Sequence, residues 1–305
     1  MHHDPAWRLK VVLAFAAVYL IWGSTYLAIR VGVAELPPAL FAGVRFVIAG
    51  LLLSLYAGWC GQKIPRAARE WKYLGVTAIL LFVVANGLVV WGEQWVPSSQ
   101  TALIVATTAL WLAGIGTLGS HGNKLARGTV LGLAIGFFGV AVLLLPTDDF
   151  VLDHFWAQLA LLAAALSWAV GSIYLKRAKP TTPPLMSAAM QSLIAGAVLC
   201  IIGVSTGEID RWGWSPDGLV MLAYLAVFGS CFGYAAYAWL LHEVNPAMLG
   251  TYAYVNPAVA VVLGWWLLDE TLSTVQFSGM AVILAGVVLV TTSKPKAIVP
   301  TAQRG

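Results

Sequence analysis

The chain has 305 residues, of which 60% are hydrophobic and only 10% are charged, and its mean hydropathy is +0.84. Because a soluble domain carries about 25% charged residues, this chain has too little polar surface to be a soluble globular protein. Its three cysteines lack disulfide or metal-ligand spacing and its five histidines form no cluster, so an embedded metalloenzyme is not expected. The composition predicts a polytopic membrane protein.

Apolar runs of about 20 residues are long enough to cross the hydrocarbon core of a bilayer. The chain contains ten such runs, separated by short loops that hold most of the charge. They cover approximately residues 11–33, 38–58, 73–92, 98–118, 129–146, 156–175, 184–206, 217–240, 246–268 and 274–292. The first run is longer than the apolar region of a secretory signal, so we expect it to remain as a span.

Basic residues are concentrated in alternate loops. With the N-terminus placed in the cytoplasm, the cytoplasmic segments hold fourteen of the seventeen Lys and Arg residues. The opposite loops hold only Arg30 and Arg211, beside several acidic residues. Because Lys and Arg favour the cytoplasmic side, the sequence predicts a multi-pass protein of the cell (inner) membrane with both termini cytoplasmic. The net charge of +4 then follows from topology and needs no nucleic-acid partner.

The second half of the chain repeats the first at an offset of 146 residues. At that offset "PPALFAGVRFVIAG" aligns with "PPLMSAAMQSLIAG", and Trp22 aligns with Trp168. Each copy has five spans, an odd number, so the second copy enters the bilayer from the opposite side. Inverted repeats suit alternating access around a site near the midplane. The predicted fold is all-α and polytopic, with ten transmembrane helices in two inverted five-helix repeats, residues 11–146 and 156–292.

Several strings resemble the EamA-type permeases of the drug/metabolite transporter superfamily. They are "IWGSTYLAIR", "AGVRFVIAG", "TYAYVNPAVAVVLGWWLLDETLS" and "GMAVILAGVVLV", and the resemblance covers about residues 11–292. It implies ten helices, a central cavity between the two halves, and export or exchange of small metabolites such as amino acids. Members usually carry a proline in the fourth span, where this chain reads "ATTALW". We therefore expect a straighter helix around Ala109.

Ionisable residues are almost absent from the spans, and the hydrocarbon stretches of the spans contain no Asp or Glu. The lone clearly intramembrane charge is Arg45, about 10 Å from the outer end of the second span at 1.5 Å per residue. Two interpretations stay open. Arg45 reaches the outer headgroups, or it faces protein, where it bonds backbone carbonyl groups, sets a positive field in the outer half of a cavity or contacts the substrate directly. Glu93, which ends the third span, is its expected ion-pair partner. We assign both residues a gating or field-setting role, and Gln191 is the equivalent of Arg45 in the second copy.

Polar and aromatic side chains near mid-membrane are the candidate substrate-binding residues. A midplane indole N–H needs a partner, and Pro257 frees the carbonyl of Ala253 in the ninth span, so that helix should bend beside a watery cavity. A purely structural packing role remains the alternative for each residue. The predicted substrate-binding set is Trp22, Thr25, Asn86, Trp168, Tyr237, Tyr252 and Asn256.

The sequence as a whole predicts a secondary transporter, not an enzyme, that exports or exchanges small polar metabolites by alternating access. Amino acids or related compounds are the favoured substrates. A sugar or nucleotide-sugar carrier and a passive channel are the alternatives. The expected partners are a small-molecule substrate and the lipid bilayer. Proton coupling is left open, as is the choice between monomer and homodimer, and no cofactor or metal is expected.

Overall fold

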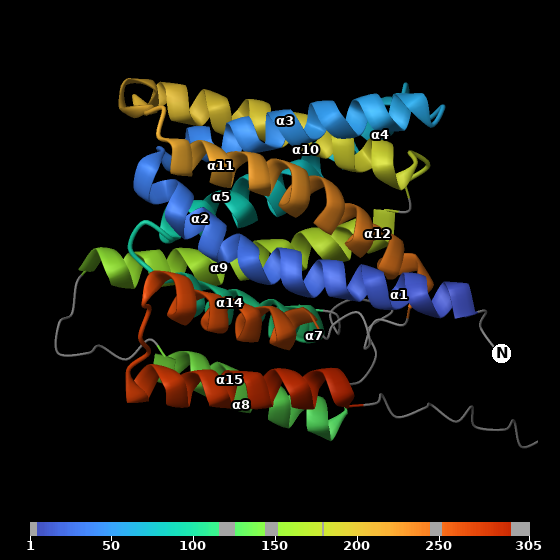
Figure 1. Ribbon diagram of the computed structural model, residues 1–305. Helices are drawn as coiled ribbons and strands as arrows, with labels where there is room; N and C mark the ends of the chain where they lie inside the picture. The colour runs from blue at the N-terminus through green and yellow to red at the C-terminus, as the bar shows by residue number, and fades with distance from the viewer. Residues whose placement is uncertain (1–4, 116–125, 144–151, 179, 245–251, 294–305) are drawn as a thin grey trace, which may run out of the picture.

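The computed structural model describes residues 5–115, 126–143, 152–178, 180–244 and 252–293. Within these ranges the chain is helical, with no β-strand. The helices lie side by side in one bundle, with α3 and α10 along one edge and α8 and α15 along the opposite edge (Figure 1).

Ten apolar helical segments correspond in order to the ten predicted spans. Seven are long enough to cross a membrane: Pro5–Glu35, Pro38–Trp59, Ala68–Gly92, Ser98–Ile115, Leu152–Ala178, Pro184–Ser205 and Pro216–Tyr237. Three are shorter: Arg127–Val142, Val255–Leu268 and Phe277–Val290. The predicted span ends at 116–118, 144–146 and 246–251 lie outside the described residues.

Shorter elements make up these segments, and their bounds fix the labels used below. In the first repeat they are α1 Pro5–Ala17, η1 Val18–Trp22, α2 Gly23–Glu35, α3 Pro38–Trp59, α4 Ala68–Thr77, η2 Ala78–Asn86, α5 Gly87–Gly92, α6 Ser98–Ala106, α7 Thr108–Ile115 and α8 Arg127–Leu143. In the second they are α9 Leu152–Ala178, α10 Pro184–Ser205, η3 Glu208–Arg211, α11 Pro216–Tyr224, η4 Leu225–Gly233, α12 Tyr234–Glu243, α14 Tyr252–Leu268 and α15 Thr274–Thr292.

Two spans contain a long π-helical stretch at equivalent places in the repeat. These are η2, Ala78–Asn86, in the third span and η4, Leu225–Gly233, in the eighth. Both ends of η4 fall 147 residues after the corresponding ends of η2. π-Helical turns are rare and occur frequently at functional sites. The repeat is therefore visible in local helix geometry as well as in residue identity.

Glycines bring α3 and α10 into backbone contact where the two repeats meet. A Cβ atom at Gly196 would lie 2.7 Å from the backbone nitrogen of Val47, and one at Gly50 would lie 2.9 Å from that of Leu193. Val47 and Leu193 are equivalent at the 146-residue offset, as are Gly50 and Gly196. Each of these two contacts is therefore the equivalent of the other with the two repeats interchanged. This is what a two-fold axis relating the repeats requires. Small residues permit this close approach of membrane helices.

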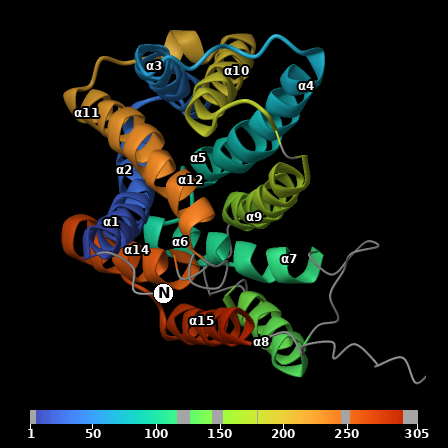
Figure 2. The ribbon, with the colours of Figure 1, turned by 90° about the vertical axis from the view of Figure 1, so that its right-hand side faces the viewer.

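The opposite edge of the bundle, formed by α8 and α15 (Figure 2), has the same arrangement. A Cβ atom at Gly132 would lie 2.9 Å from the carbonyl oxygen of Gly286, and one at Gly139 would lie 3.0 Å from that of Gly279. At an offset of 147 residues Gly132 is equivalent to Gly279 and Gly139 to Gly286, so each contact is again the equivalent of the other with the repeats interchanged. Each repeat therefore touches the other through backbone at two separate edges.

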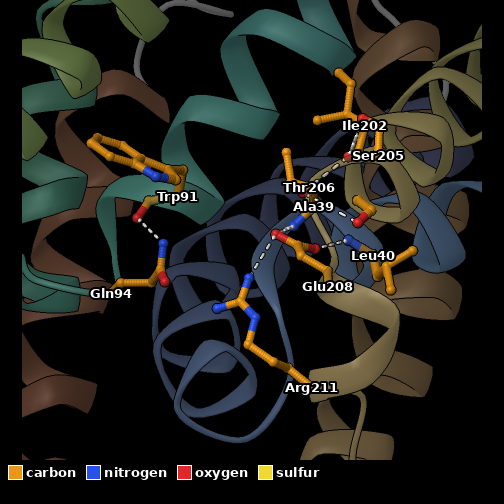
Figure 3. A network of polar contacts seen from close by, with 10 residues as sticks. Ala39, Leu40, Trp91, Gln94, Ile202, Ser205, Thr206, Glu208 and Arg211 are labelled. Atoms are coloured by element: carbon orange, nitrogen blue, oxygen red, sulfur yellow. Dashed lines mark hydrogen bonds and ion pairs between the residues drawn. The ribbon is translucent and has the colours of Figure 1, made fainter.

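Side chains of each repeat also bind the first turn of a helix in the other repeat. The Glu208 carboxylate accepts hydrogen bonds from the N–H groups of Ala39 at 3.2 Å and Leu40 at 2.7 Å (Figure 3). The Gln62 amide oxygen accepts one from the N–H of Met186 at 3.1 Å. Gln62 and Glu208 are equivalent residues, and so are Leu40 and Met186. Both acceptors satisfy N–H groups that have no partner within their own helix.

The fourth span is interrupted at Thr107 by one tight turn, and the expectation of a straighter helix around Ala109 stays a prediction. Helix α6 ends at Ala106 and α7 begins at Thr108. At Thr107 between them, both the backbone N–H, at 3.1 Å, and the side-chain hydroxyl, at 2.6 Å, donate to the carbonyl oxygen of Ile104. Back-bonding of a hydroxyl to the preceding turn bends helices. Threonine thus interrupts the span here without a proline.

Candidate functional site

A cavity of about 120 Å³ lies in the middle of the bundle and is lined by both repeats. Its wall combines aromatic rings, small aliphatic residues, hydroxyl groups and two amides. Within the described part of the chain, no Asp or Glu lines it, and no group of His, Cys, Asp or Glu is placed to hold a metal ion. The η2 and η4 segments both contribute to the wall.

Six of the seven predicted substrate-binding residues line this cavity: Trp22, Thr25, Asn86, Trp168, Tyr252 and Asn256. The seventh, Tyr237, lies behind the wall. Its ring centroid is 5.0 Å from that of Trp22 and 5.9 Å from that of Tyr252. The structure therefore brings the seven side chains together, with Tyr237 supporting two lining rings instead of lining the cavity itself.

Trp22 is the centre of an aromatic cluster. Its ring centroid lies 6.1 Å from that of Trp168 and 5.8 Å from that of Tyr252, both in edge-on geometry. Such edge-to-face pairs are favourable for aromatic rings. Its indole Nε1 donates to the carbonyl oxygen of Gly229 in η4 at 3.2 Å. A Cβ atom at Gly233 would lie 2.5 Å from this nitrogen, so glycine is needed there to leave room for the ring.

The hydroxyl and amide groups of the wall differ in whether they have hydrogen-bond partners within the protein. Thr25 donates its hydroxyl to the carbonyl oxygen of Trp22 at 2.6 Å, and the Asn86 Nδ2 donates to that of Leu81 at 2.9 Å. Asn256 is only 4% exposed, and its Oδ1 has no hydrogen-bond partner among the described residues. Because buried polar atoms normally have partners, Asn256 offers the cavity an open acceptor.

Arg45 faces the protein interior, as one of the two sequence interpretations held. The residue is 5% exposed, and its Nε donates to the Ser230 hydroxyl at 2.9 Å. Its guanidinium carbon lies 4.9 Å from the ring centroid of Phe46. Both Ser230 and Phe46 line the cavity, while the Arg45 Nη1 has no partner among the described residues. Arg45 thus places a positive charge directly behind the cavity wall.

The predicted ion pair between Arg45 and Glu93 is wrong. In the described residues the one ion pair within 4.0 Å joins Arg211 and Glu208, at 3.8 Å. Arg45 is bound instead by Ser230 of η4, whereas Glu93 lies in the turn after α5. The sequence gives no indication that the eighth span would supply the acceptor.

Glu93 is fully buried, and neither carboxylate oxygen has a partner among the described residues. Arg30 binds its backbone carbonyl oxygen and not its carboxylate. Burial raises the pKa of the Glu93 carboxyl well above its usual range, because an ionised form would lose its hydration,. Of the nearby charges, Arg30 and Arg45 lower this pKa and Glu270 raises it.

Several lining residues were not predicted, among them Tyr26, Phe46, Phe82, Ser230 and Tyr234. Tyr26 and Phe82 lie four positions from Trp22 and Asn86, so the spacing of one helical face would have found them. Ser230 and Phe46 had no such signal, because their place depends on how η4 and α3 pack.

A profile of the EamA-like transporter family matches residues 9–145 and again 155–292. Ten apolar helices, a tandem repeat and a central cavity define a membrane transporter, and the chain belongs to the EamA-like transporter family. The family's role is transport and not catalysis.

Similar proteins agree with this assignment. The "Uncharacterized inner membrane transporter YedA" of Escherichia coli K12 is 40% identical over 92% of this chain and 90% of its own length. The "Uncharacterized transporter YvbV" of Bacillus subtilis is 28% identical over 96% of this chain and 94% of its own. A crystal structure with 18% identity matches the fold with a TM-score of 0.66, covering 93% of this chain and 96% of the other.

Proposed function

We propose that this transporter exports or exchanges a small polar metabolite, an amino acid or related compound, by alternating access at the central cavity. The observation that carries the proposal is the composition of the cavity wall. Aromatic faces attract an ammonium group, and the open Asn256 Oδ1 accepts a hydrogen bond from it. The Arg45 charge behind the wall favours a carboxylate. An α-amino acid carries both groups on a single carbon atom.

The cavity volume supports a small substrate over the larger alternatives. Pockets for drug-sized ligands measure roughly 300–1,000 Å³, whereas this one measures about 120 Å³. A nucleotide sugar exceeds that space, and its phosphates would also call for more than one base. A passive ion channel would be expected to have a ring of charge or of carbonyl oxygens along its pore. No charged residue is among those that line the cavity in the described residues.

The repeat supports the mechanism, because two related halves can exchange conformations around a central site. We place the protein in the cell (inner) membrane with both termini cytoplasmic, on the distribution of Lys and Arg. In this orientation Arg45 belongs to the external half of the bilayer, and Glu93 and Glu208 lie beyond the external ends of their spans.

The test is counterflow of labelled amino acids in proteoliposomes, comparing wild type with Trp22→Ala and Asn256→Ala. We expect saturable counterflow in the wild type and at least a tenfold loss in both variants. Trp265→Ala is the matched control, since that indole is 66% exposed and is not among the residues that line the cavity. Wild-type rates in both cavity variants would contradict the assignment of the site. Unsaturable ion conductance would instead support a channel.

A further inference from the structure

Glu93 continues the face of the third span that lines the cavity. Phe82, Asn86 and Val89 line the wall at helical spacing, and Glu93 follows Val89 by four residues, its N–H donating to the Val89 carbonyl oxygen at 3.0 Å. Residues four apart lie on one side of a helix. The Glu93 carboxyl therefore lies one turn beyond the cavity, at the end of the span that we place outside.

A group of buried polar side chains follows Glu93 in the chain. Ser98, Ser99, Gln100 and Thr101 are each no more than 2% exposed, and their side-chain polar atoms have no partner among the described residues. Two backbone N–H groups of the same turn do have partners, because Glu270 accepts the N–H groups of Ser98 at 2.8 Å and Ser99 at 3.0 Å. Glu270 belongs to the second repeat and α6 to the first, so this contact joins the repeats at the external end of the cavity.

The charged and titratable groups around Glu93 come from every neighbouring element. Tyr26 and Arg30 come from α2, Arg45 from α3, and Glu270 follows α14. On α9, His154 lies near enough to interact with Arg30. None of them forms an ion pair or hydrogen bond with the Glu93 carboxylate oxygens in the described structure. An ionised carboxylate buried without such partners is very costly, so the group is neutral in this conformation.

We propose that Glu93 is a proton-binding site and that closing the external end of the cavity takes up one proton there. In the open conformation the Glu93 carboxylate is ionised and hydrated. As the end closes, a hydronium ion gives up a proton to it: an O–H bond of hydronium breaks, a carboxyl O–H bond forms and a water molecule is left. When the end opens again, the carboxyl O–H bond breaks and the proton passes to a water molecule, which becomes hydronium. This inference rests on the proposed transport function, because it assigns a proton to one of its conformational steps.

The direction of the pH effect follows from linkage. Burial gives the Glu93 carboxyl a higher pKa in the closed conformation than in water. The closed conformation therefore binds more protons than the open one, and rising pH opposes closure. Arg30 and Arg45 lower the pKa of this carboxyl and so limit the effect, but neither donates a hydrogen bond to its oxygens in the described structure.

The first test is infrared spectroscopy of the purified protein in lipid, which detects the C=O stretch of a protonated carboxyl without any substrate. At neutral pH we expect this band in the wild type, its loss at high pH, and its absence from Glu93→Gln. Glu35→Gln, which changes an exposed carboxyl on the same predicted side, should keep it. A wild type without the band, or a Glu93→Gln protein that retains it, would overturn the proposal.

The second test is the pH profile of counterflow. Wild-type and Glu35→Gln rates should fall as the pH rises, whereas Glu93→Gln, a permanent mimic of the neutral carboxyl, should give a flat profile. A pH profile in Glu93→Gln identical to the wild type would overturn the proton site while leaving the transport function intact. The proton site would also be overturned if wild-type counterflow depended on sodium, if this dependence were lost in Glu93→Gln, and if the wild type showed no protonated-carboxyl band. If no amino acid moves at all, the proposed function fails, and the infrared test still decides the proton site.

Discussion

Arg45 and Gln191 occupy equivalent positions in the two repeats, but their surroundings differ. The Gln191 Nε2 donates to the Thr77 hydroxyl at 2.7 Å, and its Oε1 accepts from the Tyr234 hydroxyl at 3.3 Å. Arg45 has one such partner, Ser230, and an unpartnered Nη1. The amide is thus held by hydrogen bonds on both of its polar atoms, while the guanidinium retains donor capacity next to the cavity.

The helix-start contacts repeat the same difference. Glu208 binds the first turn of α3 with a charged carboxylate, and Gln62 binds the first turn of α10 with a neutral amide. In both comparisons the charged member belongs to the side of the membrane that we place outside. The repeats therefore share one backbone design and differ in charge, and this asymmetry is the feature that substitutions can test.

The largest effect is expected from Gln191→Arg, which places the charge of the first repeat into the second. Gln191 is fully buried and its partners suit an amide, so the new cation would be uncompensated. Such a charge costs about 3–5 kcal/mol, and we expect little folded protein by size-exclusion chromatography in detergent. A variant that folds as stably as the wild type would show that the two positions are equivalent after all.

The shared backbone should respond equally in both repeats. Gly50→Ala and Gly196→Ala each press a methyl group against the backbone of the partner helix, and overpacking of this kind costs roughly 1–3 kcal/mol. We expect similar drops in Tm for the two variants. Gly75→Ala, in α4, is the control, because outside its own helix backbone no atom of the described residues lies within 4 Å of its Cβ position. A drop in Tm for only one of the two variants would contradict a two-fold relation between the repeats.

Arg45→Gln makes the first repeat resemble the second. It keeps a donor for Ser230 and removes the charge behind the cavity wall. For amino acid substrates we expect the KM for counterflow to rise about tenfold, which corresponds to about 1.4 kcal/mol. Methyl esters of the same amino acids, which lack the carboxylate, should be transported with an unchanged KM. An equal effect on both substrate classes would mean that Arg45 does not interact with the carboxylate.

The smallest difference is expected between Glu208→Ala and Gln62→Ala. Hydrogen bonds to charged groups contribute about 1.5–3 kcal/mol and neutral ones about 0.5–1.5 kcal/mol. The Glu208 variant should therefore lose about 1 kcal/mol more than the Gln62 variant, measured as thermal stability in the same detergent. Equal losses would restrict the charge asymmetry to Arg45 and Gln191.

The spans and the repeat could be predicted because run length and residue identity are local properties of the sequence. Candidate residues such as Trp22 and Asn256 could be found as well, since a polar atom deep in an apolar span needs a partner. The ion pair of Arg45 and the break at Thr107 could not. Both depend on which backbone or side-chain oxygen lies nearest in the packed bundle, and a single sequence does not encode that distance in any local pattern.

The contact between Trp22 and Gly233 has a consequence for the history of the chain. Gly233 is the equivalent of Asn86 at the 147-residue offset, and any side chain there would collide with the Trp22 indole. A chain assembled from two copies of the first repeat would carry asparagine at that place and could not seat the ring. Exchange of the repeats would therefore require the Trp22 ring to leave the position in which its Nε1 donates to Gly229.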